Sequence, residues 1–525
     1  MVTASELPIN ENASATQMAQ EIFGNGVTVV GASYSGDRNS SGIYTNGDSI
    51  SPNVTPGNTG VILSTGRAAD FTNSGGQANQ STNTSTNTRG VNNSSDFNAI
   101  AGTNTYDAAI LDVDFIPTGN TMTMQFVFSS EEYPEYAGSI YNDVVGVWIN
   151  GTHVPLSVGN GKTSVGNVND SNNVNLYNDN TADQFNTEMD GFTVTMTLTI
   201  PVNPGVINSI RIGIADTADS SYDSNLLIAG DSVQTVLIAN DDAVTIGEGG
   251  TKTLDVLAND YSAAGGSLTI THINGTAVTA GSSVTLATGQ VVTLNANGTF
   301  SIQTDLDIEK VSFTYGIQDS TGQTDTGFVT VDTVPCFVAG TLIRTPGGDV
   351  PVEALSPGDL VMTVDDGPQP LRWIGMREVR GTGKLAPIRF EAGALGQHNA
   401  LLLSPQHRVM IRDTYAELMF GEPEVLVAAK DLVNDKSIRR VECESATYVH
   451  ILFDRHQVVW SEGLATESFL PGPQTTKSFE NHVMEEICHI FPQLDPHTGT
   501  GYGPAARPGL RNFEAQALLA AGLAA

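Results

Sequence analysis

The residue types that can perform covalent chemistry are concentrated in the last third of this 525-residue chain. All three cysteines and seven of the nine histidines lie there, whereas only seven of the 23 lysines and arginines precede Cys336. Cys336 stands where a strand-rich stretch ends, and a thiol is strongly nucleophilic even when it is mostly protonated. This position favours a nucleophile over the alternative, a small buried apolar side chain.

Acidic side chains in the front half form a second set of candidates. Loops rich in Asp and Asn supply the hard oxygens that Ca²⁺ prefers, about six to eight per ion. The aspartates that we expect to bind calcium are Asp216, Asp219, Asp223, Asp241, Asp242 and Asp260. A further acidic group comprises Glu131, Glu132, Glu135 and Asp143. No EF-hand spacing is present, so solvated acidic loops are the alternative. A glycosidase-like carboxylate pair is disfavoured because no aromatic cleft signal accompanies it.

The overall charge excludes several classes of partner. The formal net charge is −34 and the pI is about 4.3. Such a surface repels nucleic acid and anionic membranes, and it attracts divalent cations. We therefore expect no nucleic-acid partner.

Targeting signals are also informative. No run of about 20 apolar residues occurs, so we expect no transmembrane segment. The N-terminal sequence MVTASELPINENASATQ lacks the basic start and the apolar stretch of a Sec signal. Together with the Asn/Asp/Gly-rich composition, this predicts a secreted or cell-surface protein that is exported by a route without an N-terminal Sec signal.

The elements that must position these residues are mainly β-strands. The runs AAILDVDFI, TMTMQFVF, NDVVGVWI and SIRIGIAD are rich in β-formers, and FTVTMTLTI (192–200) alternates as a half-buried strand does. The Asn/Ser/Thr-rich stretch 73–95 is predicted to be a mobile surface loop. The fold class is therefore mainly β, with antiparallel β-sandwiches in front and a short helical tail.

The front half resembles two bacterial families. FSSEEYPEYAGSIYNDVVGVWING, MDGFTVTMT and IRIGIADTADSSYDSNLLI resemble the choice-of-anchor L domain, which occurs on exported and surface proteins. ANDDAVTIGEGGTKTLDVLANDYS, NGTFSIQ and SFTYGIQDSTGQTDTGFVTVD resemble the cadherin-like, Ig-type modules of adhesins, which often bind calcium between domains. We place these domains at residues 1–238 and 239–333.

The back half resembles Hint domains, the self-processing modules of hedgehog proteins and inteins. CFVAGTLIRTPGGDVPVEALSPGDLVMTVDDG resembles the opening block, LLLSPQHRVMI the second block, and VHILFDRHQVVWSEGLATESF the closing strands. The order and the non-splicing ends are closest to the bacterial branch. We place the Hint domain at 334–470, followed by a partly helical tail at 471–525, where SFENHVMEEICHIF and NFEAQALLAAGLAA suit helices.

The resemblance implies roles for individual residues. Cys336 would attack the carbonyl of the Pro335–Cys336 bond and form a thioester. His407 would protonate the leaving nitrogen, and Ser404 would orient the scissile peptide. Asp454 and His456 fall where the family often places a polar group near the nucleophile.

Structural roles are the alternatives for the other reactive residues of this half. A strand-end salt bridge with Arg455 or Arg439 would explain Asp454 and His456 equally well. Cys443 and Cys488 are predicted to be structural. A zinc site at Cys488, His482 and His489 is disfavoured, because no CxxC accompanies these residues.

Two departures from the Hint pattern shape the predicted reaction. Asn481 is followed by His482, so the C-terminal splice junction of inteins is missing and splicing is not expected. Pro335 has a hindered carbonyl and a fixed φ, which should slow the acyl shift. We therefore predict single-turnover self-cleavage or ligation of the front modules, with no cofactor, with the chain itself as substrate and with water, a thiol or another nucleophile as acceptor. The alternative is a structural or adhesive calcium-binding protein, with a cell-surface or protein ligand, whose Hint domain is inactive or very slow.

Overall fold

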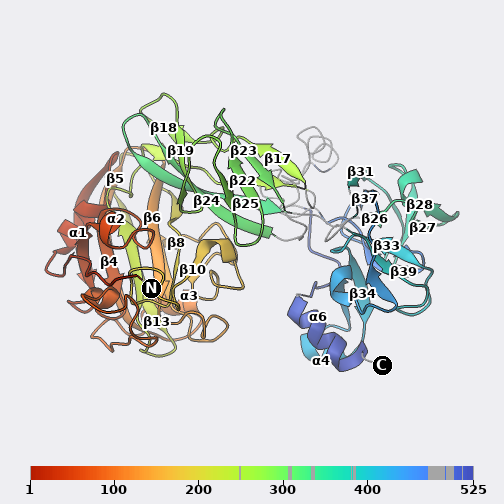
Figure 1. Ribbon diagram of the computed structural model, residues 1–525, viewed down its shortest axis with the longest axis horizontal. Helices are drawn as coiled ribbons and strands as arrows, with labels where there is room; N and C mark the ends of the chain where they lie inside the picture. Colours follow the sequence, from red (N-terminus) through yellow and green to blue (C-terminus); the bar gives the residue numbers. More distant parts are fainter. Residues whose placement is uncertain are drawn as a thin grey trace. The chain divides into compact units, whose positions relative to one another are not determined.

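The computed structural model describes residues 2–246, 250–304, 310–332, 337–379, 381, 386–470, 491, 502–510 and 512–523. The predicted scissile bond, Pro335–Cys336, lies outside the described residues, as do His482, Cys488 and His489. The chain divides into two compact units: 1–242 with 253–302 and 311–330, and 243–252 with 303–310 and 331–525. Each is described by itself (Figure 1).

The N-terminal module is an antiparallel sandwich of two sheets, as predicted. One sheet has the order β1-β3-β4-β14-β6-β11-β10, with β12 also paired to β6. Its strands are β1 (Ile9–Asn10), β3 (Ser41–Thr45), β4 (Thr59–Ser64), β6 (Thr121–Ser130), β10 (Tyr177–Asp179), β11 (Gly191–Thr193), β12 (Met196–Pro201) and β14 (Ser224–Ala229). The other sheet has the order β2-β5-β13-β7-β8, with β9 also paired to β7. Its strands are β2 (Val27–Ser35), β5 (Thr105–Pro117), β7 (Val144–Ile149), β8 (Thr152–His153), β9 (Thr163–Ser164) and β13 (Asn208–Thr217).

Alternating apolar residues of the two sheets form the core of this sandwich. Leu111, Val113 and Phe115 of β5 pack in one cluster with Phe126 and Phe128 of β6. The short helical elements of the module are α1 (Ala15–Ile22), α2 (Gly47–Ile50), η1 (Ala68–Phe71), α3 (Ser95–Ala101) and η2 (Val174–Leu176). α1 begins at a capping box, in which Ser14 accepts from the backbone N–H of Gln17 and Gln17 reaches back to the N–H of Ser14.

The prediction of one half-buried strand over 192–200 is wrong in its details. The segment divides into β11 and β12, which both pair with β6. Thr193 and Thr197, expected to face solvent, are 0% and 3% exposed. The apolar alternation is real, but the second face is buried or half-buried as well.

The second module is also built of short antiparallel strands. These are β15 (Leu237–Ile238), β16 (Asp242–Thr245), β17 (Thr251–Leu254), β18 (Tyr261–Ser262), β19 (Thr269–Ile273), β20 (Thr276–Ala277), β21 (Ser283–Thr285), β22 (Val291–Leu294), β23 (Phe300–Gln303), β24 (Lys310–Gln318) and β25 (Thr324–Asp332). β25, β24, β19 and β20 are neighbours in one sheet, and β23, β22 and β21 in another. The aromatic rings of Phe300, Phe313 and Tyr315 are buried together.

The C-terminal module contains two further sheets. The first has the order β31-β37-β26-β33-β32-β36, and the second β28-β27-β38-β39-β34-β35, with β29 paired to β38 and to β30. The strands are β26 (Phe337–Val338), β27 (Leu342–Thr345), β28 (Gly348–Pro351), β29 (Leu360–Thr363), β30 (Gly367–Pro370), β31 (Trp373–Val379), β32 (Ile388–Phe390), β33 (Leu401–Leu403), β34 (Arg408–Arg412), β35 (Glu424–Ala428), β36 (Ile438–Arg440), β37 (Ala446–Leu452), β38 (Val458–Ser461) and β39 (Leu464–Glu467). 3₁₀ turns occur at η3 (Val352–Ala354) and η5 (Ala429–Leu432).

The opening block of this module owes its residue types to turn geometry. Gly340 (φ +92°), Gly348 (φ +119°) and Gly358 (φ +99°) adopt the left-handed backbone that favours glycine. The Thr345 hydroxyl donates to the carbonyl of Gly348 at 2.6 Å, and Asp359 accepts from the backbone N–H of Ser356 at 2.8 Å. Of these residues, Thr345 and Gly348 form the turn that lets β27 pair with β28.

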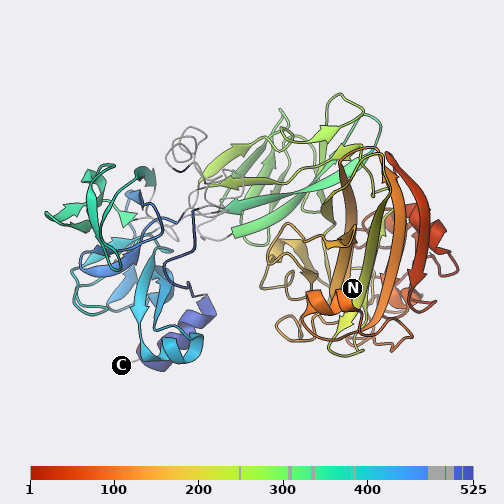
Figure 2. The ribbon, with the colours of Figure 1, turned by 180° about the vertical axis from the view of Figure 1, so that it is seen from behind.

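Helices close the C-terminal module. α4 (Thr414–Phe420) and α6 (Asn512–Leu518) lie side by side in both views (Figures 1 and 2), and the π-helical turn η6 (Leu519–Leu523) follows α6. Leu510 and Leu518 are buried in the same apolar cluster as Phe337 and Val449. The described part of the predicted tail therefore belongs to the core of this module. Within the described residues, every helix is too short or too polar to cross a membrane.

Candidate functional site

Ser404 and His407 occupy the buried turn between β33 and β34. The backbone N–H of His407 donates to the carbonyl of Ser404 at 3.0 Å, which fixes the turn. The Ser404 and His407 side chains are 1% and 2% exposed. The turn is further held by Ala429, whose N–H donates to the carbonyl of His407 at 3.0 Å. Two polar side chains are thus fixed inside the module and shielded from water.

The His407 ring lies against Phe337, the residue that follows Cys336 in the sequence. The ring centroids are 4.2 Å apart and the planes are tilted by 57°. Phe337 begins β26, where it pairs with Leu403 on one side and Val449 on the other. The block-two histidine and the start of the opening block are therefore in contact across about 70 residues of sequence.

Asp454 lies on the surface. Its carboxylate accepts from Arg372, Nε to Oδ1 at 2.9 Å and Nη2 to Oδ2 at 2.7 Å. The side chain is 55% exposed. This two-bond ion pair is the kind of contact weighed as the alternative, although the partner is Arg372 and not Arg455 or Arg439; the catalytic role of Asp454 stays a prediction.

His456 is buried, and both of its ring nitrogens are occupied. Nε2 lies 3.0 Å from the carbonyl oxygen of Ser468, and Nδ1 accepts from the backbone N–H of Ala506 at 2.9 Å. Burial lowers the pKa of His456 to about 4, so the ring is neutral near pH 7. This geometry favours a neutral ring that joins two chain segments.

Glu467 is a buried neighbour that the sequence did not single out. Its Oε1 accepts from the N–H of Arg408 at 3.0 Å, and its Oε2 lies 3.7 Å from Nε2 of His456. Complete burial raises the pKa of Glu467 to about 7, against the lowering effect of Arg408. Glu467 thus connects His456 to the residue next to His407.

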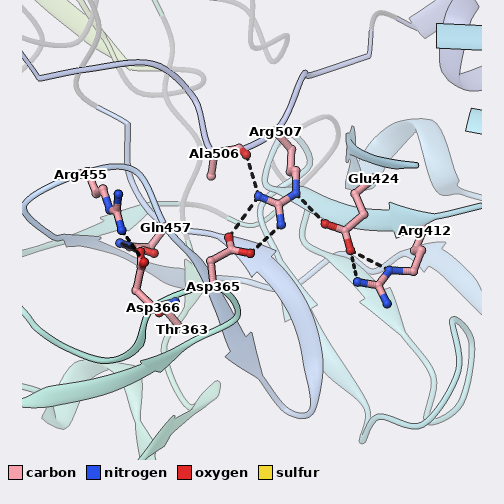
Figure 3. Close-up of polar contacts among 9 residues, drawn as sticks. All are labelled: Thr363, Asp365, Asp366, Arg412, Glu424, Arg455, Gln457, Ala506 and Arg507. Atoms are coloured by element: carbon pink, nitrogen blue, oxygen red, sulfur yellow. Dashed lines mark hydrogen bonds and ion pairs between the residues drawn. The ribbon is translucent and has the colours of Figure 1, made fainter. Parts of the chain in front are cut away.

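A C-terminal segment, residues 502–510, packs onto the same module (Figure 3). Arg507 lies between two carboxylates: Nε bonds Glu424 at 2.6 Å, and Nη2 bonds Asp365 at 2.7 Å. Arg412 also contacts Glu424. The N–H of Leu510 donates to the carbonyl of Leu426 at 2.8 Å. The sequence pattern does not predict these contacts, because an isolated Arg in a Gly/Pro-rich stretch is expected to be a solvated charge.

The three aspartates of ADTADSSYDS do not form one group. Asp216 is 1% exposed, and burial, then the Asp143 carboxylate, raise its pKa well above the usual value. Asp219 is half-buried and accepts from the N–H of Ser221 at 3.0 Å within the turn. Asp223 is 3% exposed and accepts from the N–H of Thr86 at 2.7 Å.

The aspartates near the second module make backbone contacts. Asp241 is exposed and accepts from the N–H of Phe328 at 3.1 Å, and Asp242 is half-buried. Asp260 accepts from the N–H of Asn240 at 2.7 Å and from the hydroxyl of Tyr315 at 3.0 Å. Burial raises the pKa of Asp260 to about 7.

One buried carboxylate in this module was not expected. Asp325 is 1% exposed, and burial raises its pKa to about 8. Across the parts of the chain that the structure describes, no three or more His, Cys, Asp or Glu side chains are already gathered as a finished metal site. Calcium binding therefore stays a prediction.

Three family models match successive parts of the chain. Residues 6–234 match the choice-of-anchor L domain, residues 234–332 the bacterial Ig domain, and residues 335–473 the Hint domain. The predicted family memberships are confirmed. A search of curated proteins found no match.

Solved structures give partial matches. The crystal structure of the MchDnaB-1 intein is 13% identical and matches over 25% of this chain and 99% of that chain, with a TM-score of 0.18. The M60 catalytic domain of Clostridium perfringens ZmpB, with its CBM51-1 and CBM51-2 domains, is 8% identical over 70% of this chain and 34% of that chain, with a TM-score of 0.14. The domains are identified by the family models.

Proposed function

We propose that this chain, in which a choice-of-anchor L domain and a bacterial Ig domain precede a Hint domain, is an exported or surface protein that cleaves itself at Pro335–Cys336. The front modules would be the released or ligated product. The Hint domain would act once, as a single-turnover catalyst on its own chain.

The contact between His407 and Phe337 carries this proposal. The ring centroids of His407 and Phe337 are 4.2 Å apart. Phe337 directly follows Cys336, and consecutive Cα atoms are about 3.8 Å apart, so the chain connectivity keeps Cys336 near this contact. Ser404 lies in the same turn, three residues before His407. Protonation of the leaving nitrogen would require an imidazole at the scissile amide, and His407 is a buried imidazole that contacts the next residue along the chain, Phe337.

The proposed reaction has two steps. The sulfur of Cys336 attacks the carbonyl carbon of Pro335, the C–N bond breaks, and the nitrogen of Cys336 takes up a proton by way of His407. A thioester then joins the Pro335 carbonyl to the Cys336 sulfur. Water or an added thiol attacks this thioester, which releases residues 1–335 and regenerates the Cys336 thiol.

Mass spectrometry of the intact protein tests the proposal. We expect fragments 1–335 and 336–525, formed faster with added thiol. Cys336→Ala should abolish cleavage, and His407→Ala should slow it by about 100-fold or more, the usual contribution of a general acid. Cys443→Ala is the matched control, because Cys443 is a free, half-buried thiol of the same domain. If the mass of the wild-type protein stays constant with and without thiol, self-cleavage is refuted.

A second candidate function is a structural or adhesive role for the front modules with bound calcium. The buried carboxylates favour it: Asp325 and Asp216 are each 1% exposed. An ionised carboxylate is costly to bury unless a cation or hydrogen bonds compensate it. This role is compatible with a slow or inactive Hint domain.

A further inference from the structure

Three buried carboxylates lie side by side at the ends of three neighbouring strands. Gly191 of β11 is paired with Ser130 of β6, and Ser130 is also paired with Ser224 of β14. The next residue outward on each strand is acidic: Asp190, Glu131 and Asp223. We call these three the carboxylate row. Their exposures are 0%, 1% and 3%, respectively.

The carboxylate row is poor in compensating contacts. Both carboxylate oxygens of Glu131 lack a partner with hydrogen-bond geometry, as does Oδ2 of Asp190 and of Asp223. Two neutral oxygens two residues inward along the strands, Oγ of Ser129 and Oδ1 of Asn225, are also buried without a partner. The row therefore presents several unsatisfied oxygens in a shielded place.

No basic side chain neutralises the row in the described part of the chain. Arg211, the ion-paired arginine of this module, is held by Asp96 and Asp112. Burial, then the charge of Asp190, raise the pKa of Glu131 to about 9, while the nearby Thr84 hydroxyl lowers it only in part. Without a cation, the row must hold protons or bear an uncompensated charge.

The carboxylate row also holds the loop that covers it. The Asn79 side chain donates to Oδ1 of Asp190 at 2.7 Å, and the N–H of Thr86 donates to Oδ1 of Asp223 at 2.7 Å. The N–H of Asp223 donates in return to the carbonyl of Thr84 at 2.9 Å. This stretch was predicted to be mobile from its composition, but both ends of the row bind it.

We propose that the carboxylate row of Asp190, Glu131 and Asp223 binds a calcium ion, with Ser129 and Asn225 as neutral oxygen donors, and that the ion locks loop 73–88 onto the sheet. In the described residues the three carboxylates are not gathered closely enough to hold a metal ion, so binding requires their side chains to move together. Neither carboxylate oxygen of Glu131 has a partner with full hydrogen-bond geometry, and the nearby Thr84 hydroxyl is the contact that would change when the carboxylate moves toward the ion. Ca²⁺ accepts a flexible set of oxygens, whereas Mg²⁺ demands a near-ideal octahedron.

This inference rests on the calcium role proposed for the front modules and names the site. Limited trypsin digestion of the full chain tests it, because Arg89 is an exposed cleavage point at the end of the loop. At a Ca²⁺ concentration about ten times the dissociation constant, local opening and hence cleavage after Arg89 should slow about tenfold relative to chelator. The N-terminal fragment 1–89 is followed by mass, which separates it from the 1–335 product.

Variants separate the carboxylate row from other sites. Glu131→Gln should remove the calcium protection, and Asp190→Asn should do the same if the first variant folds poorly. Glu6→Gln, at an exposed glutamate of the same module, should behave as wild type. If calcium still slows cleavage after Arg89 in Glu131→Gln, calcium does not bind at the carboxylate row, although it would bind elsewhere in the chain. If the wild-type protein shows no calcium effect on cleavage or on melting temperature, both the row and the wider calcium role fail.

Discussion

Glu467 allows a sharp test of the buried polar contacts behind the His407 turn. Its carboxylate is fully enclosed, and burial raises its pKa from 4.5 to about 7. His456 beside it has the opposite shift, because burial lowers its pKa from 6.5 to about 4. The folded Hint domain therefore prefers a protonated Glu467 and a neutral His456.

The two shifts have opposite effects on stability. A carboxyl with a raised folded pKa contributes stability that is complete below about pH 4.5 and is lost as pH rises through 7. A histidine with a lowered folded pKa contributes stability that is complete above about pH 6.5 and is lost as pH falls toward 4. Between about pH 4.5 and 6.5 the two slopes cancel in the wild-type protein.

Replacing Glu467 by Gln removes the pH dependence of stability that comes from Glu467 and leaves the one that comes from His456. Gln keeps an oxygen that can accept from the N–H of Arg408 but cannot ionise. At ~1.4 kcal/mol per pKa unit, the shift of Glu467 corresponds to roughly 3 kcal/mol. The free energy of unfolding of Glu467→Gln minus that of wild type should therefore rise by roughly 3 kcal/mol between about pH 4.5 and 7.5. The contributions of other groups cancel in this difference.

Urea unfolding of the full chain at several pH values measures the effect. Trp373 and Trp460 report on the Hint domain, which holds two of the three tryptophans. Glu417→Gln, at an exposed position of α4, is the control and should leave the pH profile unchanged. A stability difference between Glu467→Gln and wild type that stays constant across this range would refute the reasoning.

Two further substitutions test the remaining contacts of the Hint domain. Arg507→Ala removes both carboxylate contacts and leaves Glu424 less compensated; because the arginine side chain is 21% exposed, we expect a loss of about 1–2 kcal/mol in urea unfolding. The control is Arg439→Ala, at an exposed ion pair, which should leave the midpoint of urea unfolding unchanged. An equal loss of stability in both variants would contradict a specific stabilising role for the Arg507 contacts. Asp454→Ala should leave the cleavage rate, followed by intact mass, within about twofold of wild type, because exposed ion pairs contribute little. A drop of about 100-fold, as for a general acid, would restore Asp454 to the catalytic group.

The sequence predicted the parts of the Hint domain whose residue types are set locally. Gly340, Gly348 and Gly358 recur at turns that need a positive φ, so the motif can be read without a structure. The resemblance implied a role for His407 at the scissile amide, but its ring contact with Phe337 was not predicted. Local propensity and spacing cannot pair residues that different strands bring together.

The described part of the C-terminal tail shows a second limit of prediction from the sequence. Its helix over α6 was predicted from composition, and the structure confirms it. The burial of Leu510 and Leu518 in the Hint core was not visible, because a short apolar helix gives no sign of which surface it covers. The domain boundary at residue 470 stays a prediction, but residues 502–518 contribute to the stability of the module before it.

Closeness in sequence does not predict which carboxylates of the front module lie together. Asp216 is the next-to-last residue of β13 in one sheet, and Asp223 immediately precedes β14 in the other, so the turn between them crosses the sandwich. Asp143, directly before the neighbouring strand of the same sheet, is the carboxylate that acts most strongly on Asp216, whereas Asp223 lies beside Glu131 in the carboxylate row. Antiparallel pairing, which here joins residues about 60 to 90 positions apart, decides which carboxylates lie close enough to interact. A calcium site assembled this way also ties three strands and a loop to one ion, so its loss should loosen the loop before the sandwich.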